Sequence, residues 1–202
     1  MILLIDNYDS FSYNLYQLIG SCTDEEIKVI RNDELTVEEI EKLDSSHIIL
    51  SPGPGKPKDS GVCEEVAYKL KSKVPILGIC LGHQGICEIH GAKVTYAKEL
   101  MHGKQSIITF DKDESIFAGL GKSYSDDTNN QNDTNKIKIA RYHSLAVSEE
   151  GFPDELKVIA KSDDGEIMAV KHKDYDLYGF QFHPESVLTE DGKIMMENFL
   201  KL

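Results

Sequence analysis

The sequence predicts an α/β protein with an open, mostly parallel sheet, helices on both faces, and a smaller mixed or antiparallel layer. Two observations lead to this class. In the first half of the chain, short apolar runs alternate with helical patterns, and that order of elements produces a parallel sheet covered by helices. In the second half, strand-like runs are separated by hairpin-type turns such as Asp163-Asp164-Gly165, which favours antiparallel pairing.

The first half contains four apolar runs of the length expected for buried strands. They cover residues 1–5, 27–30, 47–50 and 75–79. Apolar residues between the first two runs follow the i, i+4, i+7, i+8 spacing of a one-sided helix: Phe11, Leu15, Leu18 and Ile19. Residues 37–43 and 62–71 also have a helical pattern.

The second half contains six strand-like runs and a closing helix. The runs cover residues 94–96, 106–110, 137–142, 156–160, 167–170 and 178–182. Thr189 precedes the closing helix, whose apolar residues are Ile194, Met195, Phe199 and Leu200. Residues 122–136 are polar and low in complexity, so we expect a mobile surface loop there. The chain contains no internal repeat, and residues 1–202 fit one domain.

The composition excludes several classes of function. Apolar residues make up 40% and charged residues 28%, an ordinary globular balance. The formal net charge of -13 argues against binding nucleic acid or an anionic membrane by electrostatics. No apolar segment reaches the roughly 18 residues of a membrane span, and the N-terminus lacks the basic region of a signal peptide. Without a secretion signal, the four cysteines are expected to be reduced thiols of a cytoplasmic protein.

The most informative motif is Gly78-Ile79-Cys80-Leu81-Gly82, at the end of an apolar run. It is a cysteine version of the Gly-x-nucleophile-x-Gly turn, in which a buried strand breaks sharply into a helix and presents the nucleophile at the strand's end. The glycines are expected because the strained turn leaves no room for side chains. The motif therefore predicts that Cys80 is a nucleophile. The other cysteines, Cys22, Cys63 and Cys87, are expected to be buried or inert.

A cysteine nucleophile needs a base, because a free thiol has a pKa of about 8.5 and is mostly protonated at neutral pH. His183 is the candidate imidazole. Pro184 biases His183 toward extended backbone, in which His183 and Glu185 point to the same side. Glu185 would then accept from one ring nitrogen while the other faces Cys80, as in a catalytic triad. The alternative is a surface turn of ordinary polar residues.

Three polar motifs follow predicted strands: residues 6–10, residues 51–55 and Cys80. We expect them to meet at one edge of the sheet, since ligands bind beyond the carboxyl ends of parallel strands. Two backbone N–H groups are candidates for stabilising an oxyanion. One belongs to Leu81 at the helix start, and the other comes from the Gly53-Pro54-Gly55 loop, where glycine lets the backbone approach a ligand. The alternative for that loop is a simple Pro/Gly turn.

The pairs Cys80-x-x-His83 and Cys87-x-x-His90 also permit a zinc interpretation. The spacing between the two pairs is tight, and Cys80 lies in a turn that exposes it. We therefore expect no metal, with His83 and His90 capping or packing the helix.

Together these motifs resemble the class I, triad-type glutamine amidotransferases over nearly the whole chain. More closely, the chain is similar to component II, the glutaminase subunit, of anthranilate synthase and of aminodeoxychorismate synthase. The residues that carry the resemblance are 6–14, 51–55, 78–84, 102–104, 141–145 and 182–186. The turn at residues 78–82 together with His183-Pro184-Glu185 is specific to the class. Residues 6–14 and 102–104 indicate its chorismate-using branch.

The resemblance implies hydrolysis of L-glutamine without a cofactor. It implies that Cys80 attacks the side-chain amide, that ammonia leaves with a proton supplied through His183, and that Gly55 and Leu81 form the oxyanion hole. The residues implied in holding glutamine are Gly53, Pro54, Gly55, Gln84, Ser144 and Leu145. The implied partner is the larger synthase subunit, component I, which adds the ammonia to chorismate and to which magnesium belongs.

Three questions stay open from the sequence. A non-catalytic subunit that only binds and regulates a partner is disfavoured by the intact Cys80, His183 and Glu185. A stand-alone cysteine hydrolase is disfavoured by Gln84 and the His-Pro-Glu motif. The third question is the pathway. Anthranilate synthase and tryptophan biosynthesis are favoured, and the alternative is aminodeoxychorismate synthase and folate biosynthesis, or a subunit shared by both.

Overall fold

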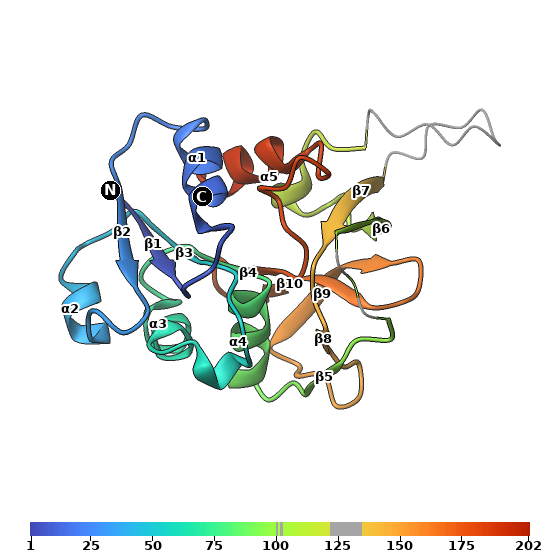
Figure 1. The fold of residues 1–202 in the computed structure, drawn as a ribbon, viewed down its shortest axis with the longest axis horizontal. Coiled ribbons are helices and arrows are strands. Elements are labelled where there is room, and N and C mark those ends of the chain that lie inside the picture. The colour runs from blue at the N-terminus through green and yellow to red at the C-terminus, as the bar shows by residue number, and fades with distance from the viewer. Residues whose placement is uncertain (100, 102, 122–134) are drawn as a thin grey trace.

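One large sheet organises the molecule. The computed structural model describes residues 1–99, 101, 103–121 and 135–202. Within them, nine strands pair in the order β2-β1-β3-β4-β11-β10-β9-β6-β7 (Figure 1). The parallel part consists of β1 (Ile2–Asp6), β2 (Ile27–Arg31), β3 (His47–Leu50), β4 (Ile76–Ile79) and β11 (Leu177–Phe180).

Antiparallel strands extend the same sheet beyond β11. They are β10 (Ile167–His172), β9 (Leu156–Ser162), β6 (Lys104–Phe110) and β7 (Lys136–Arg141). A separate antiparallel pair is formed by β5 (Val94–Tyr96) and β8 (Leu145–Val147). The predicted fold class is therefore confirmed, and most of the antiparallel strands continue the main sheet.

Helices cover both faces of the parallel part. In Figure 1, α1 (Ser12–Gly20) and α5 (Gly192–Phe199) lie on one side of the sheet. The other side carries α2 (Val37–Glu41), α3 (Cys63–Leu70) and α4 (Leu81–Ile89). Two single 3-10 turns span Pro57–Asp59 and Ser115–Phe117. The start of α2 is stabilised by a capping box between Thr36 and Glu39, because each side chain bonds the other residue's backbone N–H.

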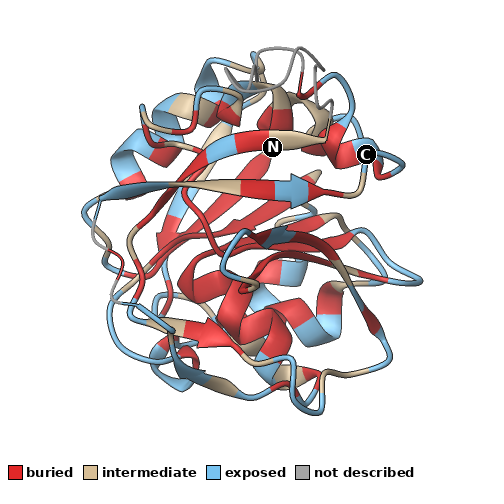
Figure 2. Cartoon of the chain, turned by 90° about the vertical axis from the view of Figure 1, so that its right-hand side faces the viewer, coloured by how far each residue is buried: buried red, intermediate tan, exposed pale blue. Residues whose placement is uncertain are grey.

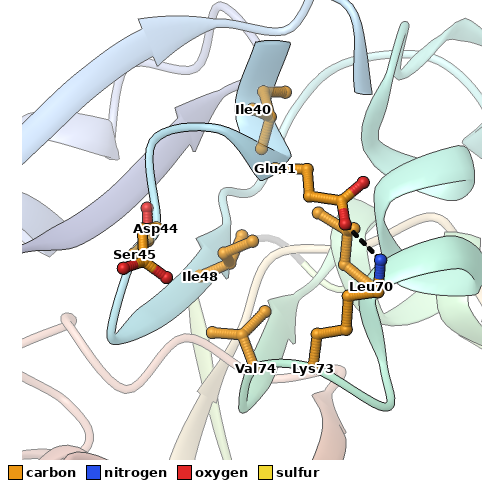
Figure 3. A pocket seen from close by; sticks show the side chains of 8 residues that line it. All are labelled: Ile40, Glu41, Asp44, Ser45, Ile48, Leu70, Lys73 and Val74. Carbon is orange, nitrogen blue, oxygen red and sulfur yellow. Dashed lines mark hydrogen bonds and ion pairs between the residues drawn. The ribbon is translucent and has the colours of Figure 1, made fainter. Parts of the chain in front are cut away.

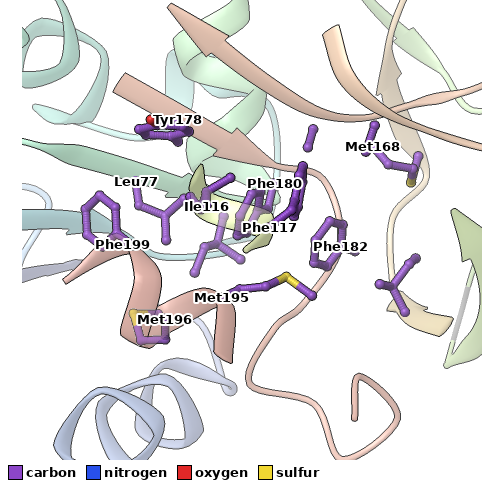
Figure 4. Packing of buried hydrophobic residues seen from close by; sticks show 14 of the residues in the cluster. Leu77, Ile116, Phe117, Met168, Tyr178, Phe180, Phe182, Met195, Met196 and Phe199 are labelled. Atoms are coloured by element: carbon purple, nitrogen blue, oxygen red, sulfur yellow. The ribbon is translucent and has the colours of Figure 1, made fainter. Parts of the chain in front are cut away.

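Each face of the sheet has its own hydrophobic core. The parallel strands β1, β3, β4 and β11 are buried at every position, and Figure 2 shows them as a continuous buried layer. Aromatic and methionine side chains fill the space between the sheet and α5, where Phe180, Phe182, Met195 and Phe199 lie together (Figure 4). Burying each such side chain stabilises the fold by about 1.5–3 kcal/mol.

The predicted strands are present, with ends that shift by one or two residues. The predicted strand 178–182 ends at Phe180. The Gln181 N–H still bonds Met168 O of β10 at 2.9 Å, but the His183 N–H bonds Ala140 O at 3.1 Å, so the chain turns toward β7. The three-residue strand β8 was missed, although its partner β5, of equal length, was predicted.

Two further expectations concern surface and membrane. Most of the predicted polar loop, residues 122–134, lies outside the described residues, and Lys136 already belongs to β7. Among the residues that the structure describes, no helix is both long enough and apolar enough to cross a bilayer.

Candidate active site

Cys80 occupies a strained turn between β4 and α4. Its backbone has φ 50° and ψ -97°, a left-handed conformation that is rare for a residue with a side chain. A Cβ at Gly78 would lie 2.5 Å from the carbonyl oxygen of Gly82, and a Cβ at Gly82 would lie 2.6 Å from that of Leu50. The predicted reason for both glycines is therefore confirmed.

The pairing of β4 with β11 brings the end of the chain to Cys80. The register joins Ile79 to Phe180, and the Cys80 N–H donates to Phe180 O at 2.7 Å. The residues that follow β11 consequently emerge beside Cys80. They include His183 and Glu185, whose Nδ1 and Oε1 atoms are 2.7 Å apart.

The backbone route to the His183–Glu185 contact differs from the prediction. Extended backbone over residues 183–185 was expected, and this is wrong. Pro184 and Glu185 lie in a turn, closed by a bond of 3.3 Å from the Ser186 N–H to His183 O. The turn still aims the ring at the carboxylate. Both side chains are almost completely buried, which shields their contact from water.

Burial and neighbouring charge act in opposite directions on His183. Burial lowers its pKa, but Cys80 and Glu185 outweigh burial and raise the pKa to about 10. Phe11 and Tyr142 pack against the ring, with centroid distances of 5.4 and 5.0 Å. The Nε2 atom of His183 is buried and forms no hydrogen bond within the described part of the chain. Since Nδ1 contacts Glu185, Nε2 is the ring nitrogen left for the interaction with Cys80 that raises the pKa.

The three polar motifs do meet at the carboxyl edge of the sheet. Asn7 donates through its N–H to Ser51 Oγ and through Nδ2 to Ser51 O, both at 2.8 Å. A Cβ at Gly53 would lie 2.5 Å from the Cβ of Asn7 and 2.7 Å from Leu81 Cδ2. The 53–55 loop, in which Gly55 has φ 85°, therefore rests on the first residue of α4. The predicted convergence is confirmed.

The remaining candidate residues are Gln84, on α4 itself, and Pro54, Ser144 and Leu145. Gln84 is buried, and its Nε2 donates to Leu145 O at 3.0 Å. Ser144 and Pro54 are exposed, and Ser144 O accepts from the Ala97 N–H at 2.9 Å. A cavity of about 320 Å³ borders Leu145 and Lys56, the neighbour of Gly55. Its further lining residues are Pro57, Lys58, Glu88, Val94 and Tyr96.

A smaller cavity lies away from these residues. Its volume is about 170 Å³, and it opens beside Ile48 at the start of β3, at the edge of the sheet opposite Cys80 (Figure 3). The Glu41 carboxylate and the Lys73 ammonium form an ion pair across its rim. No predicted site residue lines it.

Sequence reasoning missed a buried polar group in the antiparallel half. Arg141 is only 1% exposed and forms ion pairs with Asp164, at 2.9 Å, and with Glu166. Burial raises the pKa of Asp164, but hydrogen bonds from Ser162 and Arg141 outweigh it and lower the pKa to about 2. Residues 141–145 carry the family resemblance, and that was the available signal for this group.

Gln181 was also missed, although it stands two residues before His183. It is fully buried, and its Nε2 donates to Cys80 Sγ at 3.6 Å. Nothing in a single glutamine between two aromatic residues distinguishes it from other buried polar residues.

The candidate metal ligands do not form a convincing site. His83 is fully buried against Gly179, and His90 caps the end of α4 through a 2.7 Å contact between Nδ1 and Ile86 O. His90, Glu155 and His172 come within 4.8 Å of one another. However, the Lys71 ammonium lies 3.4 Å from His90 Nε2, so it competes with a cation.

The cysteines other than Cys80 have the expected inert environments. All four thiols are free. Burial raises the pKa of Cys63 to about 12 and raises that of Cys87 further. Burial also raises the pKa of the half-buried Cys22. A protonated thiol is a poor nucleophile, which leaves Cys80 as the reactive candidate.

The fold and this edge define an α/β protein with a cysteine at a strand-to-helix elbow beside a buried His–Glu pair. The chain belongs to the glutamine amidotransferase class-I family, whose model matches residues 3–202. It is 47% identical over 202 residues to the bifunctional protein TrpGD of Thermotoga maritima, covering 100% of this chain but only 32% of that protein.

Two shorter relatives match along nearly their whole length. Anthranilate synthase component 2 of Pseudomonas aeruginosa is 47% identical, with 100% of this chain and 95% of the relative covered. Aminodeoxychorismate/anthranilate synthase component 2 of Bacillus subtilis is 44% identical, with 100% and 96% covered. A solved structure from Thermoplasma acidophilum, described as a GMP synthase subunit, has a TM-score of 0.81 and 25% identity, covering 99% of this chain and 92% of that one.

Proposed function

We propose that this chain is the glutaminase subunit of a chorismate-using synthase, built as one amidotransferase domain. The observation that carries the proposal is the placement of Cys80 beside the His183–Glu185 pair in a chain whose family match spans residues 3–202. The names of relatives that match over nearly their whole length support the assignment to component 2.

In the proposed reaction, Cys80 and His183 start as thiolate and imidazolium, a state that the raised pKa of His183 favours. The sulfur attacks the side-chain amide carbon of glutamine. His183 gives its proton to the amide nitrogen, the C–N bond breaks, and ammonia leaves. Water then loses a proton to His183 and attacks the thioester, and glutamate departs as the C–S bond breaks. Glu185 orients the ring throughout by accepting from Nδ1.

The tetrahedral oxyanion in both steps needs hydrogen-bond donors that are already in place. Leu81 is the first residue of α4, and the first N–H groups of a helix have no acceptor within it. The close approach of Gly53 to Leu81 supports the proposal that Gly55 in the same loop supplies the second donor. Glutamine binding is proposed for Gly53, Pro54, Gly55, Gln84, Ser144 and Leu145, of which Leu145 borders the cavity of about 320 Å³.

Replacing the nucleophile separates the two activities of the assembled synthase. With the synthase partner present, Cys80→Ser is expected to abolish product formation from glutamine while leaving formation from free ammonia unchanged. A diazoketone analogue of glutamine should label Cys80 in the wild-type complex. Loss of both activities, or an unreactive Cys80 in the complex, would contradict the proposal.

The product identifies the pathway. We propose anthranilate synthase as the assembly, with aminodeoxychorismate synthase as the second candidate, because the Bacillus subtilis relative carries both names. Assaying the chain with chorismate and each candidate synthase partner in turn distinguishes anthranilate from aminodeoxychorismate. Formation of both products would indicate that one glutaminase serves both pathways. The four free thiols are consistent with the reducing cytoplasm that such pathways require.

The partner surface is proposed to include the start of α1. Tyr13 is 68% exposed and stacks on Tyr16 at a centroid distance of 6.4 Å, and both border a cavity of about 420 Å³ beside Asp9. Exposed aromatic residues are enriched at interfaces. Tyr13→Ala should therefore weaken association at least tenfold, measured by titration with the synthase partner. The matched control is Tyr68→Ala, a 58% exposed tyrosine on α3, and equal affinities would contradict the assignment.

A further inference from the structure

We propose that Gln181 is a positioning residue for the Cys80 sulfur, held in one orientation by Gln84, whose own amide is fixed by the Leu145 carbonyl. The inference rests on the proposed glutaminase function and adds a residue to its machinery. It is carried by hydrogen bonds that link five side chains from both halves of the sheet, each at most 8% exposed: Cys80, Gln84, Arg141, His143 and Gln181.

The backbone places Gln181 directly against the nucleophile. The β4–β11 register pairs Ile79 with Phe180, so Cys80 and Gln181 are the next residues on adjacent strands. The Gln181 N–H is bonded to Met168 O at 2.9 Å, which anchors the residue to β10. Its Nε2 then donates to Cys80 Sγ at 3.6 Å, within the range for a hydrogen bond to sulfur.

A second amide determines which end of Gln181 faces the sulfur. Gln181 Oε1 accepts from Gln84 Nε2 at 3.0 Å, so the Gln181 amino group must point away from Gln84 and toward Cys80. Gln84 cannot reverse its own amide without cost. Its Nε2 also donates to Leu145 O at 3.0 Å, and a reversed Gln84 would set its oxygen against two acceptors.

The Leu145 carbonyl, which can only accept, is itself held by His143 and the buried Arg141. Leu145 O also accepts from His143 Nδ1 at 2.8 Å, and His143 Nε2 accepts from Arg141 Nε at 3.1 Å. Because a guanidinium only donates, Nδ1 of a neutral His143 must carry the proton. Burial and Arg141 lower the pKa of His143 to about 4, which keeps the ring neutral. Arg141 itself is held by Asp164 and Glu166.

The consequence is a donor that always faces the sulfur. An N–H directed at Sγ favours the thiolate over the thiol and restricts its position before attack. When water opens the thioester, the electron pair of the C–S bond returns to sulfur, and the same N–H stabilises the thiolate as it leaves. Gln181 thus acts through Cys80 and has no direct contact with glutamine in this role.

The test compares Gln181→Met, which keeps the length of the side chain and removes the donor, with the wild-type complex. The pH dependence of Cys80 alkylation by iodoacetamide, followed by mass spectrometry of the Cys80 peptide, reports the thiolate. We expect its midpoint to rise by about one pH unit and kcat for glutamine to fall about tenfold, with KM within about twofold. Synthesis from free ammonia should be unchanged. Gln17→Met, at an exposed position on α1, is the matched control.

If the Gln181→Met variant unfolds, the same alkylation measurement is made on Gln181→Glu. It keeps the size of the side chain but turns a carboxylate toward sulfur, so the alkylation midpoint should rise further than with methionine. An unchanged alkylation profile in a folded variant would overturn the inference, even if activity fell. Failure of the proposed glutaminase function would give a different result. In that case the Cys80→Ser complex would still form product from glutamine.

Discussion

In the parallel part of the sheet, β1, β3, β4 and β11 are buried at every position, whereas β6 and β9 in the antiparallel part alternate between buried and exposed residues. Strands covered on both faces have no room for polar side chains along their length. Their chemistry is therefore confined to the ends, where Asn7, Ser51 and Cys80 stand. The antiparallel part instead buries a charged group, Arg141 with Asp164 and Glu166.

The two parts meet at β11, and this seam explains where the site lies. The strand pairs in parallel with β4 on one side and antiparallel with β10 on the other. The residues after it consequently contact Cys80 of the parallel part and the polar residues of the antiparallel part. We infer that one part of the sheet supplies the candidate reactive groups and that the other holds them in place. Four predictions test this division.

The largest effect on activity is expected at His183, in the segment that follows β11. His183→Asn should lower kcat for glutamine about a thousandfold, because proton transfer to and from the reacting atoms is lost. Synthesis from ammonia should persist in the same complex. The matched control is His172→Asn, a buried histidine of β10 outside the proposed site, which should retain glutaminase activity. Equal loss in both variants would show that histidine replacement acts through the fold.

The second prediction tests the holding role of the antiparallel part. Arg141→Met leaves the buried Glu166 carboxylate without its partner, so the free energy of unfolding should fall by about 3–5 kcal/mol. Urea denaturation followed by circular dichroism measures the change. The control Lys161→Met breaks an exposed pair with Glu149 and should change stability by less than about 1 kcal/mol. Similar values for both variants would contradict a structural role of the buried cation.

The third prediction concerns the histidine packed beneath the seam. Burial lowers the pKa of His83 to about 3. The folded and unfolded states are both neutral at this residue above pH 6.5, the ordinary value. Below pH 6.5, His83 binds a proton in the unfolded state but stays neutral in the folded state. The free energy of unfolding therefore falls by about 1.4 kcal/mol per pH unit. Between pH 7 and pH 5, His83→Gln should therefore lose about 2 kcal/mol less stability than wild type. Parallel curves would contradict a buried neutral His83.

The smallest effect is expected between the helices α3 and α4. Burial and the neighbouring Glu88 raise the pKa of Glu64 to about 7. The folded state thus favours the protonated carboxyl, and its contribution to stability is lost as pH rises through that value. Glu64→Gln should stabilise the protein at pH 8.5 by about 0.5–1 kcal/mol, since partial exposure screens the effect, and should be neutral below the ordinary pKa of 4.5. Glu65→Gln, at an exposed neighbouring position, is the control, and an equal change there would contradict the assignment.

Much of the fold and the candidate site was predictable because the signals are local. The apolar runs of the parallel strands, the glycines around Cys80, and the spacing of His183 and Glu185 are each visible within a few residues. The strand β8 was not predicted, although β5 of the same length was, because the only strand that β8 pairs with among the described residues is about 50 residues away in the chain. The backbone between His183 and Glu185 was predicted wrongly, because the turn depends on bonds to β7 and within the loop.

The sequence by itself therefore determined the class of fold, and it supplied the candidate nucleophile and the candidate pair that would serve it. The tertiary structure decided that Gln181 faces Cys80, 101 positions away, and that Arg141 anchors the bonds leading to it. The physical reason is that hydrogen bonds between distant segments depend on strand register. Register is a property of the whole sheet, and no short stretch of residues encodes it.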